Sequence, residues 1–79
     1  MSLIGNTKRD ILVRLREGPT HGYEIANELG ISKGYVYQHL EELQEEGMIE
    51  IYENETEGRQ RTTYRLTENG QLLLEALGL

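Results

Sequence analysis

The sequence predicts an α+β fold that is mainly helical: a three-helix bundle, a β-hairpin and a short C-terminal helix, in that order. The first observation is that apolar residues recur with helical spacing as far as residue 46, between glycines that would end helices. The second is that residues 48–52 and 61–66 change to the period of two that strands show. The third is the short connection, residues 30–32, between the second and third helices, which suits a helix-turn-helix.

The first helix is predicted over residues 8–17. Asn6 or Thr7 can cap its start, and the Gly-Pro pair at 18–19 ends it. Val13 points away from the apolar face and indicates a second contact surface. The apolar face itself consists of Ile11, Leu12 and Leu15.

The next two helices form the helix-turn-helix. The second helix is predicted over residues 22–29 and is closed by Gly30, because glycine most easily adopts the left-handed conformation that follows a helix. Ser32 is a suitable N-cap for the third helix, over residues 33–46, which Gly47 ends. The apolar stripe of the third helix consists of Val36, Leu40 and Leu43.

The last third of the chain completes the fold. The two strands form a hairpin around a polar turn, and this hairpin is a wing over residues 53–61. Thr67 then caps a last helix over residues 68–77, whose apolar residues wrap more of its circumference than one core can cover. The predicted architecture is therefore a winged helix-turn-helix, formed as a single domain by residues 1–79.

The composition excludes several classes of protein. A chain of 79 residues has room for one core, and 37% hydrophobic residues is too many for disorder. There is no apolar run of about 20 residues for a membrane span and no signal-peptide pattern, so we expect a cytoplasmic protein. The sequence has no cysteine, no phosphate-loop or nucleophile-elbow motif and no metal-ligand spacing. We therefore expect neither an enzyme nor a protein with a metal or other cofactor.

The charge is segregated along the chain. Fourteen acidic and eight basic residues give a net charge of −6, which by itself would repel nucleic acid. The acids crowd residues 41–57, whereas the bases cluster near the start of the chain and again over residues 59–65. This distribution is compatible with a local basic face on an acidic body.

Four segments resemble the PadR-type transcription regulators. HGYEI at 21–25 is similar to the signature that opens the second helix of this family, and SKGYVYQHL at 32–40 is similar to SPGSLYPAL at the start of its recognition helix. EGMI at 46–49 and YRLTENG at 64–70 are similar to the family's EGLI and YRLTEAG. The four matches fall in order and cover roughly residues 10–77. The resemblance implies a winged-helix regulator that binds DNA as a dimer.

The sequence also departs from the PadR pattern. Lys33 and Gln38 stand where the family has prolines, and the short turn before the third helix is more similar to MarR- and TrmB-type winged helices. The long C-terminal dimerisation helix of the family is reduced to about ten residues. These departures concern the subfamily and the geometry of a dimer, whereas the winged-helix assignment rests on all four segments.

The N-terminal end of the third helix is the candidate DNA-binding site. In helix-turn-helix docking this end reaches the base edges, and its free amides and positive macrodipole favour phosphate. Gln38 can read adenine, Lys33 can contact phosphate or guanine, and Gly34 permits close approach of the backbone. The alternative is a solvated helix face with packing tyrosines, of which Tyr37 can equally belong to the core. The candidates are Ser32, Lys33, Gly34, Tyr35, Tyr37 and Gln38.

Two further places are candidates for contact with the DNA backbone. Tyr23, at the start of the second helix, is either a phosphate contact or a ring stacked on the neighbouring helix. Arg59 and Arg61 flank the wing and can lie along phosphates or in a minor groove, although glutamates make the wing acidic and an ordinary solvated hairpin is the alternative.

The remaining titratable residues receive structural interpretations. The third helix carries an acidic run that we expect to be a solubilising face turned away from DNA, with a protein-partner surface as the alternative. His21 and His39 are expected to be hydrogen-bonded structural residues and not metal ligands. The acidic run consists of Glu41, Glu42, Glu45 and Glu46.

We therefore expect a sequence-specific DNA-binding transcriptional regulator, a repressor, that acts as a homodimer on a roughly palindromic operator. The recognition helix, 33–46, would enter the major groove, with the wing, 53–61, on the backbone or in the minor groove. The alternative, favoured by the net charge of −6, is a winged-helix module that binds another protein and not DNA. A small-molecule effector stays open, because no residue cluster indicates one. The expected dimer interface consists of Val13, Leu73, Leu74 and Leu77.

Overall fold

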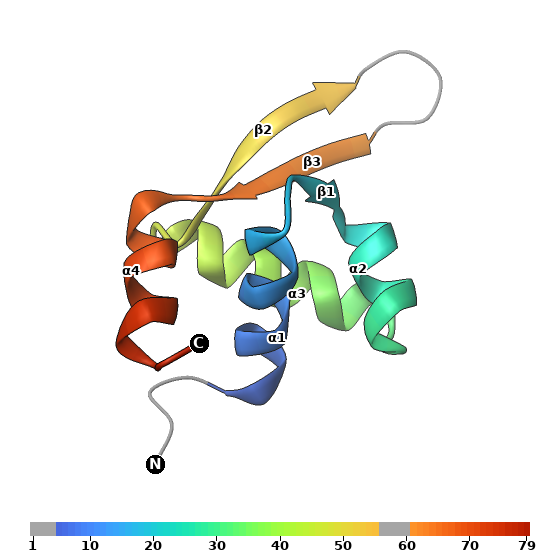
Figure 1. The fold of residues 1–79 in the computed structure, drawn as a ribbon. Coiled ribbons are helices and arrows are strands. Elements are labelled where there is room, and N and C mark those ends of the chain that lie inside the picture. Colours follow the sequence, from blue (N-terminus) through green and yellow to red (C-terminus); the bar gives the residue numbers. More distant parts are fainter. Residues whose placement is uncertain (1–4, 56–60) are drawn as a thin grey trace.

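The computed structural model describes residues 5–55 and 61–79, with the side chains of residues 54, 55 and 61 outside the description. The helices lie against the base of a sheet, and a β-hairpin extends beyond them as the wing (Figure 1). None of the helices in the described part is long and apolar enough to cross a membrane. The elements are α1 (Asn6–Arg16), β1 (Thr20–His21), α2 (Gly22–Leu29), α3 (Lys33–Glu45), β2 (Ile49–Glu55), β3 (Arg61–Leu66) and α4 (Glu68–Ala76).

The predicted hairpin is confirmed, and β2 runs antiparallel to β3. It pairs Ile49 with Leu66 and Ile51 with Tyr64. Between Ile51 and Glu53 the register shifts, which is the mark of a β-bulge. Bulges increase the local twist, so the wing bends as it leaves the helices.

A third strand, β1, is not predicted by the sequence, because two residues carry no periodic pattern. Thr20 pairs with Tyr64 and His21 pairs with Thr63, so the strand order is β1-β3-β2. Since α2 begins immediately after β1, this pairing ties the start of the helix-turn-helix to the base of the wing.

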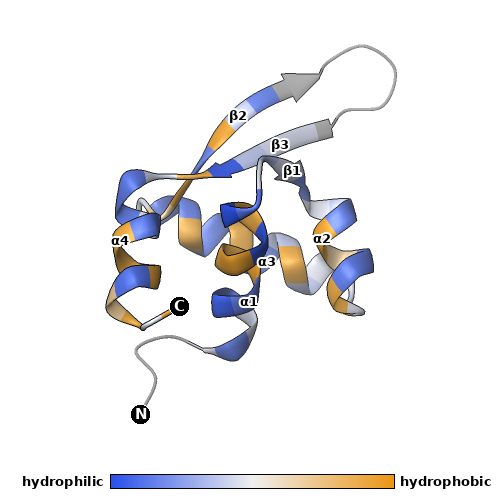
Figure 2. Ribbon diagram, in the orientation of Figure 1, coloured by the Kyte–Doolittle hydropathy of each residue, from blue (hydrophilic) through white to orange (hydrophobic). Residues whose placement is uncertain are grey.

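One hydrophobic core joins the helices to the sheet. Along the helices, hydrophobic residues alternate with hydrophilic ones (Figure 2), and the apolar faces predicted for α1 and α3 are confirmed as buried. Each buried leucine or isoleucine contributes roughly 1.5–3 kcal/mol by leaving water. The core consists of Ile11, Leu12, Leu15, Ile25, Ala26, Val36, Leu40, Leu43, Ile49, Tyr64 and Leu74.

Local capping interactions set the helix boundaries as predicted for α2, α3 and α4. The Ser32 hydroxyl accepts a hydrogen bond from the Tyr35 amide at 3.2 Å, and the Thr67 hydroxyl accepts one from the Gly70 amide at 3.1 Å. After α2, Gly30 has a φ of 68°, in the left-handed region. These signals are local, which is why the sequence alone carries them.

The predicted start of α1 is wrong. The helix begins at Asn6 with Gly5 in the N-cap position, and no side chain caps it. The Arg9 amide already donates to the Gly5 carbonyl at 3.1 Å, so Asn6 and Thr7 lie inside the first turn. Their side chains therefore cannot act as the predicted cap.

The free face of α4 also differs from the prediction. Leu74 is fully buried in the core of its own chain, so the predicted role of Leu74 in a dimer interface is wrong. Leu73 and Val13 are partly buried and pack against the same core. The leucine that α4 does expose is Leu72, with 54% of its surface accessible.

Candidate nucleic-acid interface

The starts of α2 and α3 meet at Gly22. A β-carbon at Gly22 would lie 2.8 Å from two ring atoms of Tyr37 and 3.0 Å from Leu40, closer than real contacts allow. The absence of a side chain thus lets α2 pack tightly against α3. As a result Tyr37, which is still 42% exposed, sits over the beginning of α2.

Lys33 and Tyr23 meet on the solvent side of this junction. The Lys33 ammonium nitrogen lies 4.0 Å from the centroid of the Tyr23 ring, within the range of a cation–π interaction. The ring of His21 contacts the same tyrosine edge-on, with 6.5 Å between centroids. Tyr23 therefore contacts the neighbouring helix α3 through Lys33. It is also 47% exposed, so its ring stays at the surface.

His21 has a role that its residue type does not predict. Its Nδ1 accepts a hydrogen bond from the Glu24 amide at 3.4 Å, so it occupies the N-cap position of α2. The only sequence signal is its place directly before Gly22, because serine, threonine, aspartate and asparagine are the usual capping residues.

The outward face of α3 is open. Nothing lies within 4 Å of the position that a β-carbon would take at Gly34, and Gln38 is exposed. Ser32 caps the helix, and the remaining free amides of the first turn carry the positive end of the helix dipole. Four predicted residues therefore share one region: Ser32, Lys33, Gly34 and Gln38.

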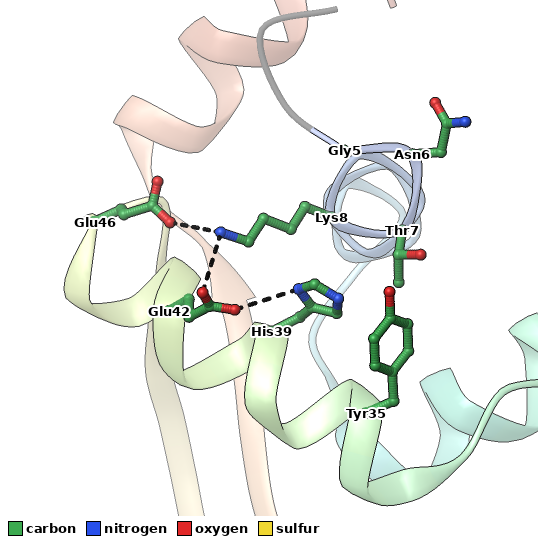
Figure 3. Close-up of a pocket in the computed structure, with 8 residues that line it drawn as sticks. All are labelled: Gly5, Asn6, Thr7, Lys8, Tyr35, His39, Glu42 and Glu46. Carbon is green, nitrogen blue, oxygen red and sulfur yellow. Dashed lines mark hydrogen bonds and ion pairs between the residues drawn. The ribbon is translucent and has the colours of Figure 1, made fainter.

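Tyr35 lies on the other flank of α3. Its ring packs edge-on against His39, with 4.5 Å between centroids, and its hydroxyl end lies beside Thr7 of α1 (Figure 3). Both residues line a cavity of about 440 Å³ between α3 and the start of α1. The structure therefore does not bring Tyr35 together with Lys33 and Tyr23.

On this flank of α3, two of the four glutamates in the acidic run form ion pairs with α1. The Lys8 ammonium of α1 lies 3.0 Å from Glu46 and 3.8 Å from Glu42 (Figure 3). These two carboxylates therefore fasten α3 to α1 and are more than a solvated face. The other two, Glu41 and Glu45, are exposed.

His39 does not meet the expectation of a hydrogen-bonded structural residue. Its ring nitrogens are buried and neither forms a hydrogen bond, although Nδ1 lies 3.5 Å from a Glu42 oxygen. Among the described residues, no group of three or more histidine, aspartate or glutamate side chains is arranged to hold a metal ion.

Tyr64 connects the wing to α3. It is buried in the core, and burial together with the neighbouring Tyr37 and Glu41 raises the pKa of its hydroxyl above the usual value. Burial is the largest cause, and the negative charge of Glu41 on α3 adds to it because it disfavours the ionised hydroxyl. Arg59 lies outside the described residues and the Arg61 side chain is not described, so the expected contacts of the wing stay predictions.

Two basic side chains of the described residues stand out because they form no ion pair with a carboxylate. Four basic side chains pair with carboxylates, whereas Lys33 and Arg16 form no ion pair in the described part of the chain. Lys33 is therefore an uncompensated positive charge at the helix-turn-helix junction. The paired basic residues are Lys8, Arg9, Arg14 and Arg65.

Both the sequence and the fold are similar to those of known proteins. Residues 11–76 match the model of the transcriptional regulator PadR-like family. No curated protein matches the sequence at a significant level. Solved structures with the same fold include a PadR family transcription regulator from Clostridium difficile, with 27% identity over 94% of this chain and 84% of that one, and a TM-score of 0.81.

Two similar structures contain DNA. PadR of Bacillus subtilis, solved in complex with operator DNA, has 28% identity over 94% of this chain and 47% of its own, with a TM-score of 0.81. A Lactococcus lactis ZitR mutant, solved in complex with DNA, has 27% identity over 95% of this chain and 51% of its own, with a TM-score of 0.80. The chain therefore spans about half the length of these two proteins.

Proposed function

This chain belongs to the PadR-like family of transcriptional regulators, and from that premise we propose that it binds double-stranded DNA with the N-terminal end of α3 in the major groove. The sequence-specific complex would form in the cytoplasm. No catalytic role is proposed.

One observation carries this proposal: an unpaired ammonium group lies where the starts of α2 and α3 meet. Lys33 forms no ion pair among the described residues, and it adjoins the positive end of α3. Both features attract phosphate, even though the chain as a whole has a net charge of −6. A local positive site of this kind allows a protein with a negative net charge to bind the negatively charged DNA backbone.

The residues around Lys33 can read the bases. Gln38 faces outward and can form a bidentate pair with adenine, while Gly34 leaves room for the backbone to approach the groove. Ser32 and Tyr37 flank this face. We leave Tyr35 out of the proposed contacts because it packs towards α1, and Arg59 and Arg61 stay proposed backbone contacts of the wing.

The relatives support the same mode of action. PadR of Bacillus subtilis and ZitR of Lactococcus lactis, both with this fold, were solved with DNA. We infer a homodimeric repressor whose two α3 helices enter major grooves ~34 Å apart on a roughly palindromic operator. The first and last helices would supply the interface through Val13, Leu73 and Leu77, joined by the exposed Leu72.

A titration of a labelled random duplex of about 30 base pairs tests the proposal. Fluorescence anisotropy is recorded at several salt concentrations from about 50 mM upward. We expect micromolar or tighter binding whose logarithm falls linearly with the logarithm of salt concentration. Absence of binding at the lowest salt, both to this duplex and to the gene's own upstream region, would contradict it and favour the protein-binding module.

A further inference from the structure

We propose that Tyr23 is a positioning residue, which holds the Lys33 ammonium group ready for a DNA phosphate. The proposal rests on the proposed function and adds how this contact is prepared before DNA arrives. It gives Tyr23 a different role from the direct phosphate contact expected from the sequence. The face of the ring acts on Lys33, and the hydroxyl is not required.

The contact joins two fixed points of the backbone. Tyr23 is the second residue of α2 and Lys33 is the first residue of α3. His21 caps the start of α2 and Ser32 caps the start of α3, so a side-chain hydrogen bond stabilises the backbone at each helix start. The 4.0 Å between the ammonium and the ring centroid is well inside the roughly 6 Å limit of a cation–π interaction.

The ring restrains the lysine without neutralising it. Acidic residues outnumber basic ones, and four other bases of the described residues are each paired with a carboxylate. A carboxylate on Lys33 would cancel its charge and would have to be displaced by the phosphate. An aromatic face attracts the cation through its quadrupole and carries no net charge, so the full positive charge stays available.

Restraint before binding is an advantage because a lysine side chain loses much conformational freedom when it is immobilised. Lys33 loses part of this conformational freedom before DNA binds, because its side chain already rests on the ring of Tyr23. An exposed cation–π contact corresponds to about two- to five-fold in an equilibrium constant, which sets the size of the expected effect.

The experiment compares five variants in the anisotropy titration described above. Tyr23→Phe keeps the ring and removes the hydroxyl, Tyr23→Leu removes the ring, and Lys33→Gln removes the charge. The double variant Y23L/K33Q measures the coupling between the two. Arg16→Gln is the matched charge control, since Arg16 is also unpaired among the described residues but lines a groove that contains no residue of α2 or α3. Thermal melting confirms that each variant is folded.

Five results are expected together, one for each variant. Tyr23→Phe binds as tightly as the wild type, and Tyr23→Leu binds about two- to five-fold more weakly. Lys33→Gln lowers the salt slope by ~0.9, the value for one lost phosphate contact, whereas Arg16→Gln leaves the slope unchanged. In the Lys33→Gln background, Tyr23→Leu has no further effect.

A measurement without DNA separates this proposal from the proposed function. The ring current of Tyr23 shifts the Lys33 ε-methylene NMR signals upfield in the wild type and in Tyr23→Phe, and the shift is lost in Tyr23→Leu. Unshifted signals in the wild type would overturn the positioning role whatever the DNA result. If the wild type binds DNA but Tyr23→Leu and Lys33→Gln are additive, or Tyr23→Phe weakens binding as much as Tyr23→Leu, the role is overturned while DNA binding stands. Wild type that fails to bind any duplex overturns both.

Discussion

The ring of Tyr37 covers Gly22 so closely that a β-carbon at Gly22 would lie 2.8 Å from it. Gly22 opens α2 directly after β1, and β1 pairs with β3 of the wing. This contact therefore joins the start of α2, the proposed recognition helix and the sheet. A change at Gly22 should disturb all three.

Gly22→Ala is expected to destabilise the fold by about 1–3 kcal/mol, the usual cost of extra volume in a packed site. The Tyr37 ring would have to move outward, since the added methyl group occupies its place. Urea denaturation gives the change in the free energy of unfolding, and the anisotropy titration should show weaker DNA binding. An alanine variant with unchanged stability would show that the ring yields without cost.

Gly34→Ala is expected to act in the opposite direction on stability. No atom lies within 4 Å of the added β-carbon, and alanine in place of glycine stabilises a helix by roughly 0.5–1 kcal/mol. If α3 enters the major groove, the same methyl group obstructs the close approach of the backbone and weakens DNA binding. Stability gained together with affinity lost would locate Gly34 at the DNA, and unchanged affinity would remove it from the proposed interface.

Thr67 fastens α4 to the end of α3 through both functions of its hydroxyl. The hydroxyl accepts from the Gly70 amide at 3.1 Å and donates to the Gly47 carbonyl at 2.6 Å. Thr67→Val, which keeps the shape, should lower the free energy of unfolding by about 1–2 kcal/mol, while Thr67→Ser should retain most of it. Equal urea midpoints for the valine and serine variants would contradict this assignment.

The parts of the fold that the sequence predicts depend on local signals. The capping contacts of Ser32, Gly30 and Thr67 join residues no more than four positions apart, so these capping roles follow from neighbouring residue types. By contrast, β1 exists because Thr20 and His21 find partners more than forty positions away on β3. A two-residue strand has no pattern of its own, so only the folded sheet reveals it.

The candidate site is predictable in position but not in the direction of its side chains. Lys33 and Tyr35 are two residues apart on α3, and at 100° per residue they point to different flanks. Lys33 contacts Tyr23 of α2, whereas Tyr35 contacts His39, which lies on the side of α3 that faces α1. Which flank meets which helix depends on how α1 and α2 cross α3, and that arrangement is set by the core.

The raised pKa of the Tyr64 hydroxyl predicts how the stability of the fold changes at alkaline pH. Burial, Tyr37 and Glu41 raise the pKa of its hydroxyl in the folded protein above the value of about 10 in the unfolded chain. The folded state therefore holds this proton at pH values where the unfolded state has lost it. The stabilisation is complete below pH ~10 and is lost as the pH rises from there towards the folded pKa.

Tyr64→Phe should remove this alkaline loss, because phenylalanine has no proton to release. Urea denaturation of both proteins between about pH 8 and 11 should show a steeper fall in the free energy of unfolding for the wild type. Tyr52→Phe, which changes an exposed tyrosine of the same sheet, is the matched control and should keep the wild-type slope. If Tyr64→Phe and the wild type lose stability in parallel above pH ~10, the folded environment does not hold the Tyr64 proton, and the proximity of Glu41 to the wing has no energetic consequence.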